Sequence, residues 1–105
     1  MTDRAPGKVP RILCAGGAVQ DIVMRVEKFP DAGSKVQASE FLITSGGQAG
    51  NAAVAVARLG AQCGYIGALG DADDDVANRI VRTFKNENID VSRAIRVPAR
   101  SRRYR

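Results

Sequence analysis

Apolar and polar positions divide the chain into alternating strand-like and helix-like segments. The run RILCAGG at residues 11–17 is a short apolar stretch ending in glycine, which predicts a buried strand covered on both faces. Residues 49–60, AGNAAVAVARLG, predict a packed helix, because they are rich in alanine, carry one charge at Arg58 and end at Gly60. The apolar run CGYIGALG at residues 63–70 predicts a second buried strand.

The segment between the first strand and the first helix has a different pattern. Ile22, Met24 and Val26 recur in a partial period of two, residues 29–33 form a turn cluster, and residues 34–44 read as a second half-buried strand. This pattern predicts a hairpin that projects from the main layer. Met24 and its aromatic neighbours Phe29 and Phe41 are interpreted as packing residues, with contact to a ligand as the alternative.

An acidic stretch marks the start of a second helix. Asp73, Asp74 or Asp75 is expected to open it, since carboxylates cap helix N-termini and are favoured by the helix dipole. Its apolar stripe is expected at helical spacing: Val76, Ala77, Ile80, Val81 and Phe84. A strand near Ile95 then completes a βαβαβ series, which predicts an α/β fold with parallel pairing.

The acidic stretch has one alternative interpretation, a calcium loop. Val76 stands where such a loop needs glycine, and Arg82 stands where it needs a bidentate glutamate. Capping is therefore favoured, and no metal site is expected there.

The net charge of +5 on this 105-residue chain suggests a nucleic-acid partner only at first sight. Four of the 16 basic residues lie in the last six positions and all 11 acidic residues precede them, so the rest of the chain is nearly neutral. The basicity belongs to the tail at residues 98–105, which is interpreted as foreign to the fold. A nucleic-acid module remains the weakest of the alternatives, and no nucleic-acid partner is expected.

Cysteine usage and the N-terminal sequence indicate a cytoplasmic protein. Cys14 and Cys63 each lie inside an apolar run, which suits small buried residues better than a disulfide, and the absence of histidine excludes a Cys/His zinc site. The first 11 residues are polar, contain Pro6 and Pro10 and precede no long apolar segment. No membrane partner is expected.

The stretch SGGQAGN at residues 45–51 is costly to order, because glycine loses the most backbone entropy on folding. One interpretation is an anion site formed by free N–H groups at the start of the helix. Another is close packing, with Asn51 satisfying local N–H groups. The stretch is neither a Walker loop nor a G-x-G-x-x-G fingerprint.

Residues 46–70, GGQAGNAAVAVARLGAQCGYIGALG, resemble the first signature of the ribokinase-like (PfkB) carbohydrate kinase family in the spacing of their glycines, Asn51 and small residues. The resemblance extends over residues 11–97. It implies the N-terminal portion of a Rossmann-like fold with a small β-sheet lid at about residues 21–44. In that family the γ-phosphoryl of ATP passes to an alcohol group of a sugar, nucleoside or similar acceptor.

The resemblance also implies the substrate-binding residues. Gly46 and Gly47 would let the backbone approach the sugar, Asn51 would hydrogen-bond its hydroxyls, and Asp21 would accept hydroxyl protons at the exit of the first strand. Gln48 stands where ribokinases often carry lysine, which argues against ribose itself as the acceptor.

The family's catalytic Gly-Ala-Gly-Asp run has no counterpart in the chain, so no catalytic, nucleotide-binding or metal-binding residue is assigned. ATP and Mg²⁺ are implied by the resemblance, with sites mostly outside this chain. The resulting expectation is an inactive N-terminal fragment of a sugar or nucleoside kinase, the product of a truncated or frameshifted gene. The alternative is a non-catalytic fragment that binds a sugar or pairs through its lid, and a homo-oligomer formed through the lid stays open.

Overall fold

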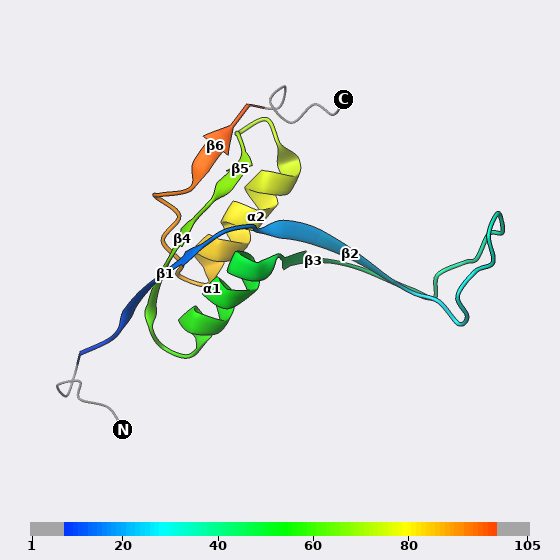
Figure 1. Ribbon diagram of the computed structural model, residues 1–105, viewed down its shortest axis with the longest axis horizontal. Coiled ribbons are helices and arrows are strands. Elements are labelled where there is room, and N and C mark those ends of the chain that lie inside the picture. The colour runs from blue at the N-terminus through cyan, green and yellow to red at the C-terminus, as the bar shows by residue number, and fades with distance from the viewer. Residues whose placement is uncertain (1–7, 99–105) are drawn as a thin grey trace.

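The computed structural model describes residues 8–98, and Figure 1 shows two parts, a helix-bearing core and a long two-stranded hairpin. The core consists of β1 (Arg11–Ala15), α1 (Gln48–Arg58), β4 (Gln62–Ile66), β5 (Ala68–Gly70), α2 (Asp75–Asn86) and β6 (Ile95–Val97). The hairpin consists of β2 (Val19–Arg25), β3 (Glu40–Gly46) and their connection at residues 26–39. The expected order of elements is confirmed, although β4 and β5 replace one predicted strand.

The strands of the core pair in parallel, as the βαβαβ pattern predicts. β1 pairs with β4 and β5 pairs with β6. β4 and β5 are separated by Gly67, so the single strand expected over residues 63–70 is interrupted. A Cβ at Gly67 would overlap the Tyr65 hydroxyl and the Gly16 carbonyl, which explains a glycine at the break.

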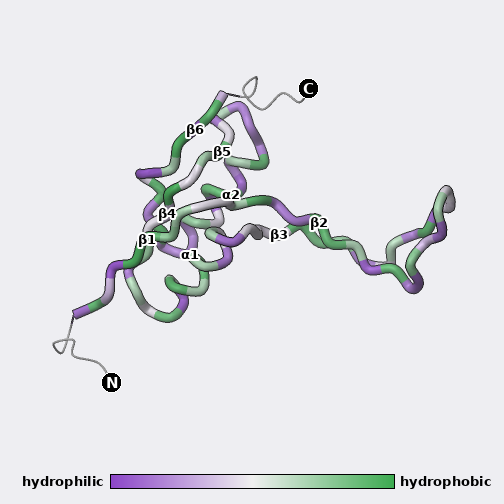
Figure 2. The backbone as a smooth tube through the Cα atoms, viewed as in Figure 1, coloured by the Kyte–Doolittle hydropathy of each residue, from purple (hydrophilic) through white to green (hydrophobic). Residues whose placement is uncertain are grey.

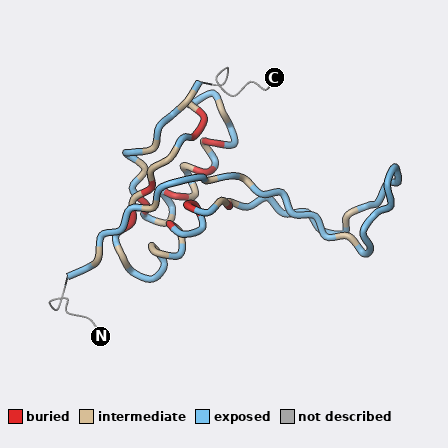
Figure 3. The backbone as a smooth tube through the Cα atoms, in the orientation of Figure 1, coloured by how far each residue is buried: buried red, intermediate tan, exposed pale blue. Residues whose placement is uncertain are grey.

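Both helices pack against one face of the β1–β4 pair. Cys63 and Tyr65 alternate with exposed or half-buried residues along β4, so their side chains share a face. They belong to one buried cluster with residues of both helices, including Ala53 of α1 and Phe84 of α2. Figure 3 shows that the buried positions gather where the helices meet these strands.

Helix α2 begins at a side-chain cap. Asp74 is the N-cap, and its carboxylate accepts hydrogen bonds from the N–H groups of Val76 at 3.0 Å and Ala77 at 3.1 Å. The buried stripe is Ala77, Ile80 and Phe84, whereas Val76 is 41% exposed. The expected start and most of the expected stripe are confirmed, and the prediction for Val76 is wrong because the buried spacing begins one residue later.

The opposite face of the β1–β4 pair is open within residues 8–98. Leu13 is 52% exposed, although its side chain lies over Gly64 of the neighbouring strand. In the described residues β1 pairs with β4 alone, so it is an edge strand, and the exposure of Leu13 shows that the prediction of cover on both faces is wrong within residues 8–98. The apolar sequence of β1 suits a strand buried on both faces, and the described helices cover one of them.

The hairpin extends away from the core, as Figure 1 shows. β2 and β3 are antiparallel, with Asp21 opposite Thr44, and the predicted hairpin is confirmed with slightly longer limits than residues 21–44. Figure 2 shows apolar residues along both strands. They lie on both faces of the ribbon and are exposed: Ile22 by 54% and Leu42 by 57%, for example.

The two cysteines are free thiols, and Cys63 is buried while Cys14 is half-buried. Burial is the main cause that raises the pKa of the Cys63 thiol to about 11, with a smaller contribution from Cys14. Cys63 belongs to the buried cluster and Cys14 packs against it, which confirms the predicted packing role of both residues.

Candidate functional site

The candidate site lies where the hairpin joins the core. The loop after β1 leads into β2, and β3 leads through Gly47 into α1. The carbonyl oxygen of Gly17 in that loop accepts hydrogen bonds from the N–H groups of Ala49 at 3.1 Å and Gly50 at 3.2 Å. The loop therefore joins the root of the hairpin directly to the start of α1.

Asp21 lies near this root, on the first half of β2. A Cβ at Gly46 would overlap the Asp21 carboxylate, so the carboxylate lies directly against the Gly46 backbone. Asp21 is exposed, and its carboxylate makes no hydrogen bond or ion pair within residues 8–98. The structure thus brings together two of the predicted site residues and leaves the charge of one of them free to bind a ligand.

Gly47 is required by the backbone itself. Its φ of 89° and ψ of 154° belong to a region that glycine alone occupies readily. A Cβ at this position would lie 2.6 Å from the Gly17 carbonyl oxygen and 2.9 Å from the Ala18 Cα. The predicted close approach at Gly47 is therefore an approach of two backbone segments of this chain.

Asn51 lies in the first turn of α1, and its side chain is exposed. Gly47 is the N-cap of this helix and no side chain caps it, so the interpretation of Asn51 as a local cap is wrong. The Asn51 N–H donates to the Gly47 carbonyl at 2.9 Å, as expected inside a helix. Its side-chain amide has no partner in residues 8–98.

The start of α1 offers little room for an anion. Two of its first N–H groups donate to the Gly17 carbonyl, and a third, that of Asn51, is bonded within the helix. A phosphate would have to displace the Gly17 carbonyl, whose partial negative charge already occupies the positive end of the helix. The packing interpretation of the glycine-rich stretch is therefore better supported than the anion interpretation.

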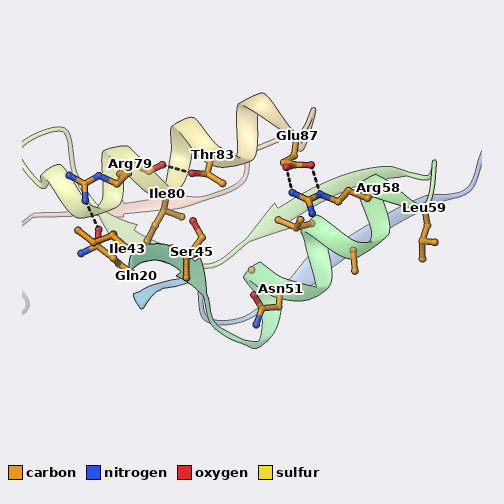
Figure 4. A pocket seen from close by; sticks show the side chains of 14 residues that line it. Gln20, Ile43, Ser45, Asn51, Arg58, Leu59, Arg79, Ile80, Thr83 and Glu87 are labelled. Carbon is orange, nitrogen blue, oxygen red and sulfur yellow. Dashed lines mark hydrogen bonds and ion pairs between the residues drawn. The ribbon is translucent and has the colours of Figure 1, made fainter. Parts of the chain in front are cut away.

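A groove of about 730 Å³ lies between the two helices and the root of the hairpin. Asn51 lines it, as do Gln20 and Ser45, whereas Asp21 and Gly46 do not. Successive residues of a strand point to opposite faces, so Gln20 and Asp21 diverge. Figure 4 shows Asn51 at the start of α1, apart from the two contacts that join separate elements across the groove, Arg58 with Glu87 and Arg79 with Gln20.

Those two contacts were not found by reading the sequence. The Arg58 guanidinium donates two hydrogen bonds to the Glu87 carboxylate, at 3.0 and 2.7 Å, and joins the ends of the two helices. This hydrogen bonding lowers the pKa of Glu87 and raises that of Arg58. Arg79 donates to Gln20 Oε1 at 2.9 Å and joins α2 to the hairpin. The lone charge on α1 was a signal for the first pair, and nothing local in the sequence indicated the second.

The acidic stretch before α2 is a capping structure. Asp74 caps the helix, and the Asp71 carboxylate accepts a hydrogen bond from the Asp73 N–H at 3.0 Å. In the part of the chain that the structure describes, no group of three acidic, cysteine or histidine side chains is placed to hold a metal ion. None of the helices in residues 8–98 is long and apolar enough to cross a membrane.

These elements define a ribokinase-like α/β fold, and comparison with known proteins identifies the family. The chain belongs to the pfkB family of carbohydrate kinases, whose model matches residues 9–103. Mouse (Mus musculus) ketohexokinase is 34% identical over 82 residues, which cover 78% of this chain and 27% of the ketohexokinase.

Solved structures agree with this assignment. A structure from Agrobacterium tumefaciens, provisionally assigned as a ribokinase, is 36% identical with a TM-score of 0.78, over 88% of this chain and 29% of that one. Aminoimidazole riboside kinase from Salmonella enterica, solved with aminoimidazole riboside and an ATP analogue, is 31% identical with a TM-score of 0.62, over 82% of this chain and 25% of that one. The chain therefore spans between a quarter and a third of these relatives.

Proposed function

We propose that this chain supplies the acceptor-alcohol pocket of an ATP-dependent sugar or nucleoside kinase. The observation that carries the proposal is the Asp21 carboxylate, which is exposed, unpaired within residues 8–98 and in contact with Gly46 at the root of the hairpin. A free carboxylate is a strong acceptor for sugar hydroxyls. Membership of a carbohydrate kinase family and the riboside bound in the Salmonella relative support this class of acceptor.

Three further residues complete the proposed pocket. The Asn51 amide can both donate to and accept from neighbouring hydroxyls, which suits a polyol that presents both kinds of group. Gly46 and Gly47 contribute by allowing the close packing of the hairpin root, because a Cβ at Gly46 would overlap the Asp21 carboxylate and a Cβ at Gly47 would meet the Gly17 carbonyl oxygen. Binding would then require Asn51, now in the groove, and Asp21 to face one acceptor from the two sides of the hairpin root.

The described residues do not fit a nucleotide. Three of the N–H groups at the start of α1, those of Ala49, Gly50 and Asn51, are already bonded, and no group of three acidic, cysteine or histidine side chains in residues 8–98 is placed to hold a metal ion. We therefore assign the ATP and Mg²⁺ sites to the parts of the family fold outside this chain. Phosphoryl transfer needs positioned charge and a base, so the chain alone is expected to be inactive.

The test is a titration of the ¹⁵N-labelled chain with ribose, fructose and aminoimidazole riboside, followed by NMR. We expect shifts at the amides of Asp21, Gly46, Gly47 and Asn51 with at least one acceptor. Asp21→Ala should weaken binding by about 10- to 100-fold and Asn51→Ala by about fivefold, because bonds to a charged acceptor contribute about 1.5–3 kcal/mol and neutral ones about 1.

Matched variants separate the pocket from general effects of charge and polarity. Asp31→Ala removes a carboxylate from the far end of the same hairpin, and Asn86→Ala removes an exposed amide from α2; neither should change binding. A coupled assay should find no sugar-dependent ADP release. The proposal is wrong if no acceptor moves the four amides, or if the control variants weaken binding as much as the site variants.

The exposed apolar residues on both faces of the hairpin favour a second candidate function, association through this lid with another copy or with a full-length kinase. Sedimentation of the chain, alone and mixed with such a kinase, tests it. We also propose a cytoplasmic location, which rests on the cysteine usage and the N-terminal sequence.

A further inference from the structure

The loop that joins β1 to β2 is bonded on two sides. The Gly16 N–H donates to the Ile66 carbonyl of β4 at 3.0 Å. On the other side, the Gly17 carbonyl accepts the Ala49 and Gly50 N–H groups at the start of α1. The same loop therefore leads into the strand that carries Asp21 and is hydrogen-bonded to the start of the helix that carries Asn51.

A buried side chain of β4 is hydrogen-bonded to this loop. Tyr65 of β4 is 0% exposed, and its hydroxyl donates to the Gly16 carbonyl at 2.8 Å. Its ring packs against the ring of Phe84, with centroids 5.0 Å apart. Gly67 leaves the space that the hydroxyl and the carbonyl occupy. The ring thus belongs to the core, while the hydroxyl is directed at the loop.

The hydroxyl is a donor throughout the neutral pH range. Burial raises the pKa of Tyr65 above its ordinary value of 10.0, so the proton that bonds Gly16 is retained. A phenylalanine ring would pack against Phe84 equally well, but it would leave the Gly16 carbonyl without this donor. The hydroxyl therefore contributes something that core packing does not require.

We propose that Tyr65 is a positioning residue, whose hydroxyl sets the placement of Asp21 relative to Asn51 by holding the loop between them. The identity of the ligand in this inference rests on the proposed function. The coupling between the Tyr65 hydroxyl and the hydrogen bonds at the start of α1 does not. Loss of the hydroxyl leaves the Gly16 carbonyl without this donor. The hydrogen bonds from the Ala49 and Gly50 N–H groups to the neighbouring Gly17 carbonyl should then open more readily.

Amide hydrogen exchange of the full chain tests the coupling without any sugar. In Tyr65→Phe we expect amide exchange at Ala49 and Gly50 to rise about fivefold to tenfold relative to exchange at Asp90. Asp90 is the reference because its N–H donates to the Cys63 carbonyl at 2.9 Å and does not contact the loop. Thr83→Val is the matched control. It also removes a hydroxyl that donates to a backbone carbonyl, that of Arg79 at 3.0 Å, and should leave the ratio unchanged.

A sugar titration of the same variants then tests the link to binding. Tyr65→Phe should weaken the acceptor-induced shifts at Asp21 and Asn51 together, whereas Thr83→Val should leave both intact. If the unaltered chain binds none of the acceptors, the proposed function fails, while the exchange ratio still decides the coupling. An exchange ratio in Tyr65→Phe equal to that of Thr83→Val would overturn the positioning role.

A second measurement uses the unaltered chain and so does not depend on the folding of a variant. The Tyr65 hydroxyl proton should exchange slowly with solvent and show a nuclear Overhauser contact to Gly67. A hydroxyl proton that exchanges at the rate of an exposed tyrosine would equally overturn the proposal.

Discussion

The core and the hairpin use similar apolar residues in opposite ways. Within residues 8–98, all nine buried hydrophobic residues lie in the core, and the large apolar residues of the two hairpin strands are 39–59% exposed. The core is stabilised by side chains packed between two helices and one face of the strands. The hairpin is held by backbone pairing, which by itself makes a two-stranded ribbon marginal in water. The core therefore buries its apolar side chains, whereas the hairpin strands leave much of theirs in solvent.

The largest expected effect separates two phenylalanines. Phe84→Ala should lower the free energy of unfolding by about 3–5 kcal/mol, because it leaves a cavity at a side chain that is 0% exposed. Phe41→Ala, at a hairpin side chain that is 59% exposed, should change it by about 0.5 kcal/mol or less. Urea unfolding at low protein concentration measures both. Equal losses would contradict this difference and show that the hairpin is packed against something in solution.

A smaller effect separates two glycines with positive φ. Gly47→Ala should destabilise the chain by about 2–3 kcal/mol, since its backbone region excludes side chains and the new Cβ would meet the Gly17 carbonyl. Gly33→Ala, at the open end of the hairpin with nothing within 4 Å, should cost only the left-handed penalty of about 1 kcal/mol. Thermal melting of both variants checks the order. A larger loss at Gly33 would mean that the hairpin end, not its root, limits stability.

The smallest effect concerns two ion pairs. Glu87→Gln removes the two-bond pair with Arg58, and Glu40→Gln removes the single 3.2 Å contact with Arg25 on the hairpin. The pKa of Glu87 is lowered in the folded chain, so its contribution is complete above the unfolded value of about 4.3 and disappears as the pH falls through the folded value. Unfolding curves of Glu87→Gln and the unaltered chain should therefore differ at neutral pH and converge in acid.

The ion pair on the hairpin is expected to contribute less than the pair between the two helices. Glu40→Gln should shift the unfolding curves less than Glu87→Gln at neutral pH, because both partners on the hairpin are about 70% exposed. High salt should reduce both effects. A pH-independent difference for Glu87→Gln would contradict the role assigned to its carboxylate.

Local patterns were sufficient to predict the elements of the core. The acidic start of α2, the apolar run of β1 and the glycine after α1 each determine structure within a few residues. The interruption at Gly67 was not predictable in this way, because it depends on the Tyr65 hydroxyl and on Gly16, which is 49 residues away from Tyr65. The exposure of Leu13 was missed for a similar reason, since an apolar run specifies burial but not which segment provides it.

The candidate site was predictable only as a set of residues. The four site residues, Asp21, Gly46, Gly47 and Asn51, were identified from the resemblance to a family, and that resemblance is confirmed. It could not show that the Asp21 carboxylate lies against Gly46, because that contact follows from the register of β2 and β3. Nor could it show that Gly47 rather than Asn51 caps α1. The roles of the four residues toward an acceptor stay predictions.

The close contact of Gly47 with Gly17 and Ala18 has a mechanical consequence. Each hairpin strand has seven residues, which at about 3.4 Å per residue makes a lever of about 24 Å. A rotation of roughly 10° about that contact moves the outer ends of the strands by about 4 Å, more than the diameter of a water molecule. Any small rotation at this contact would therefore be amplified several-fold at Arg25 and Glu40.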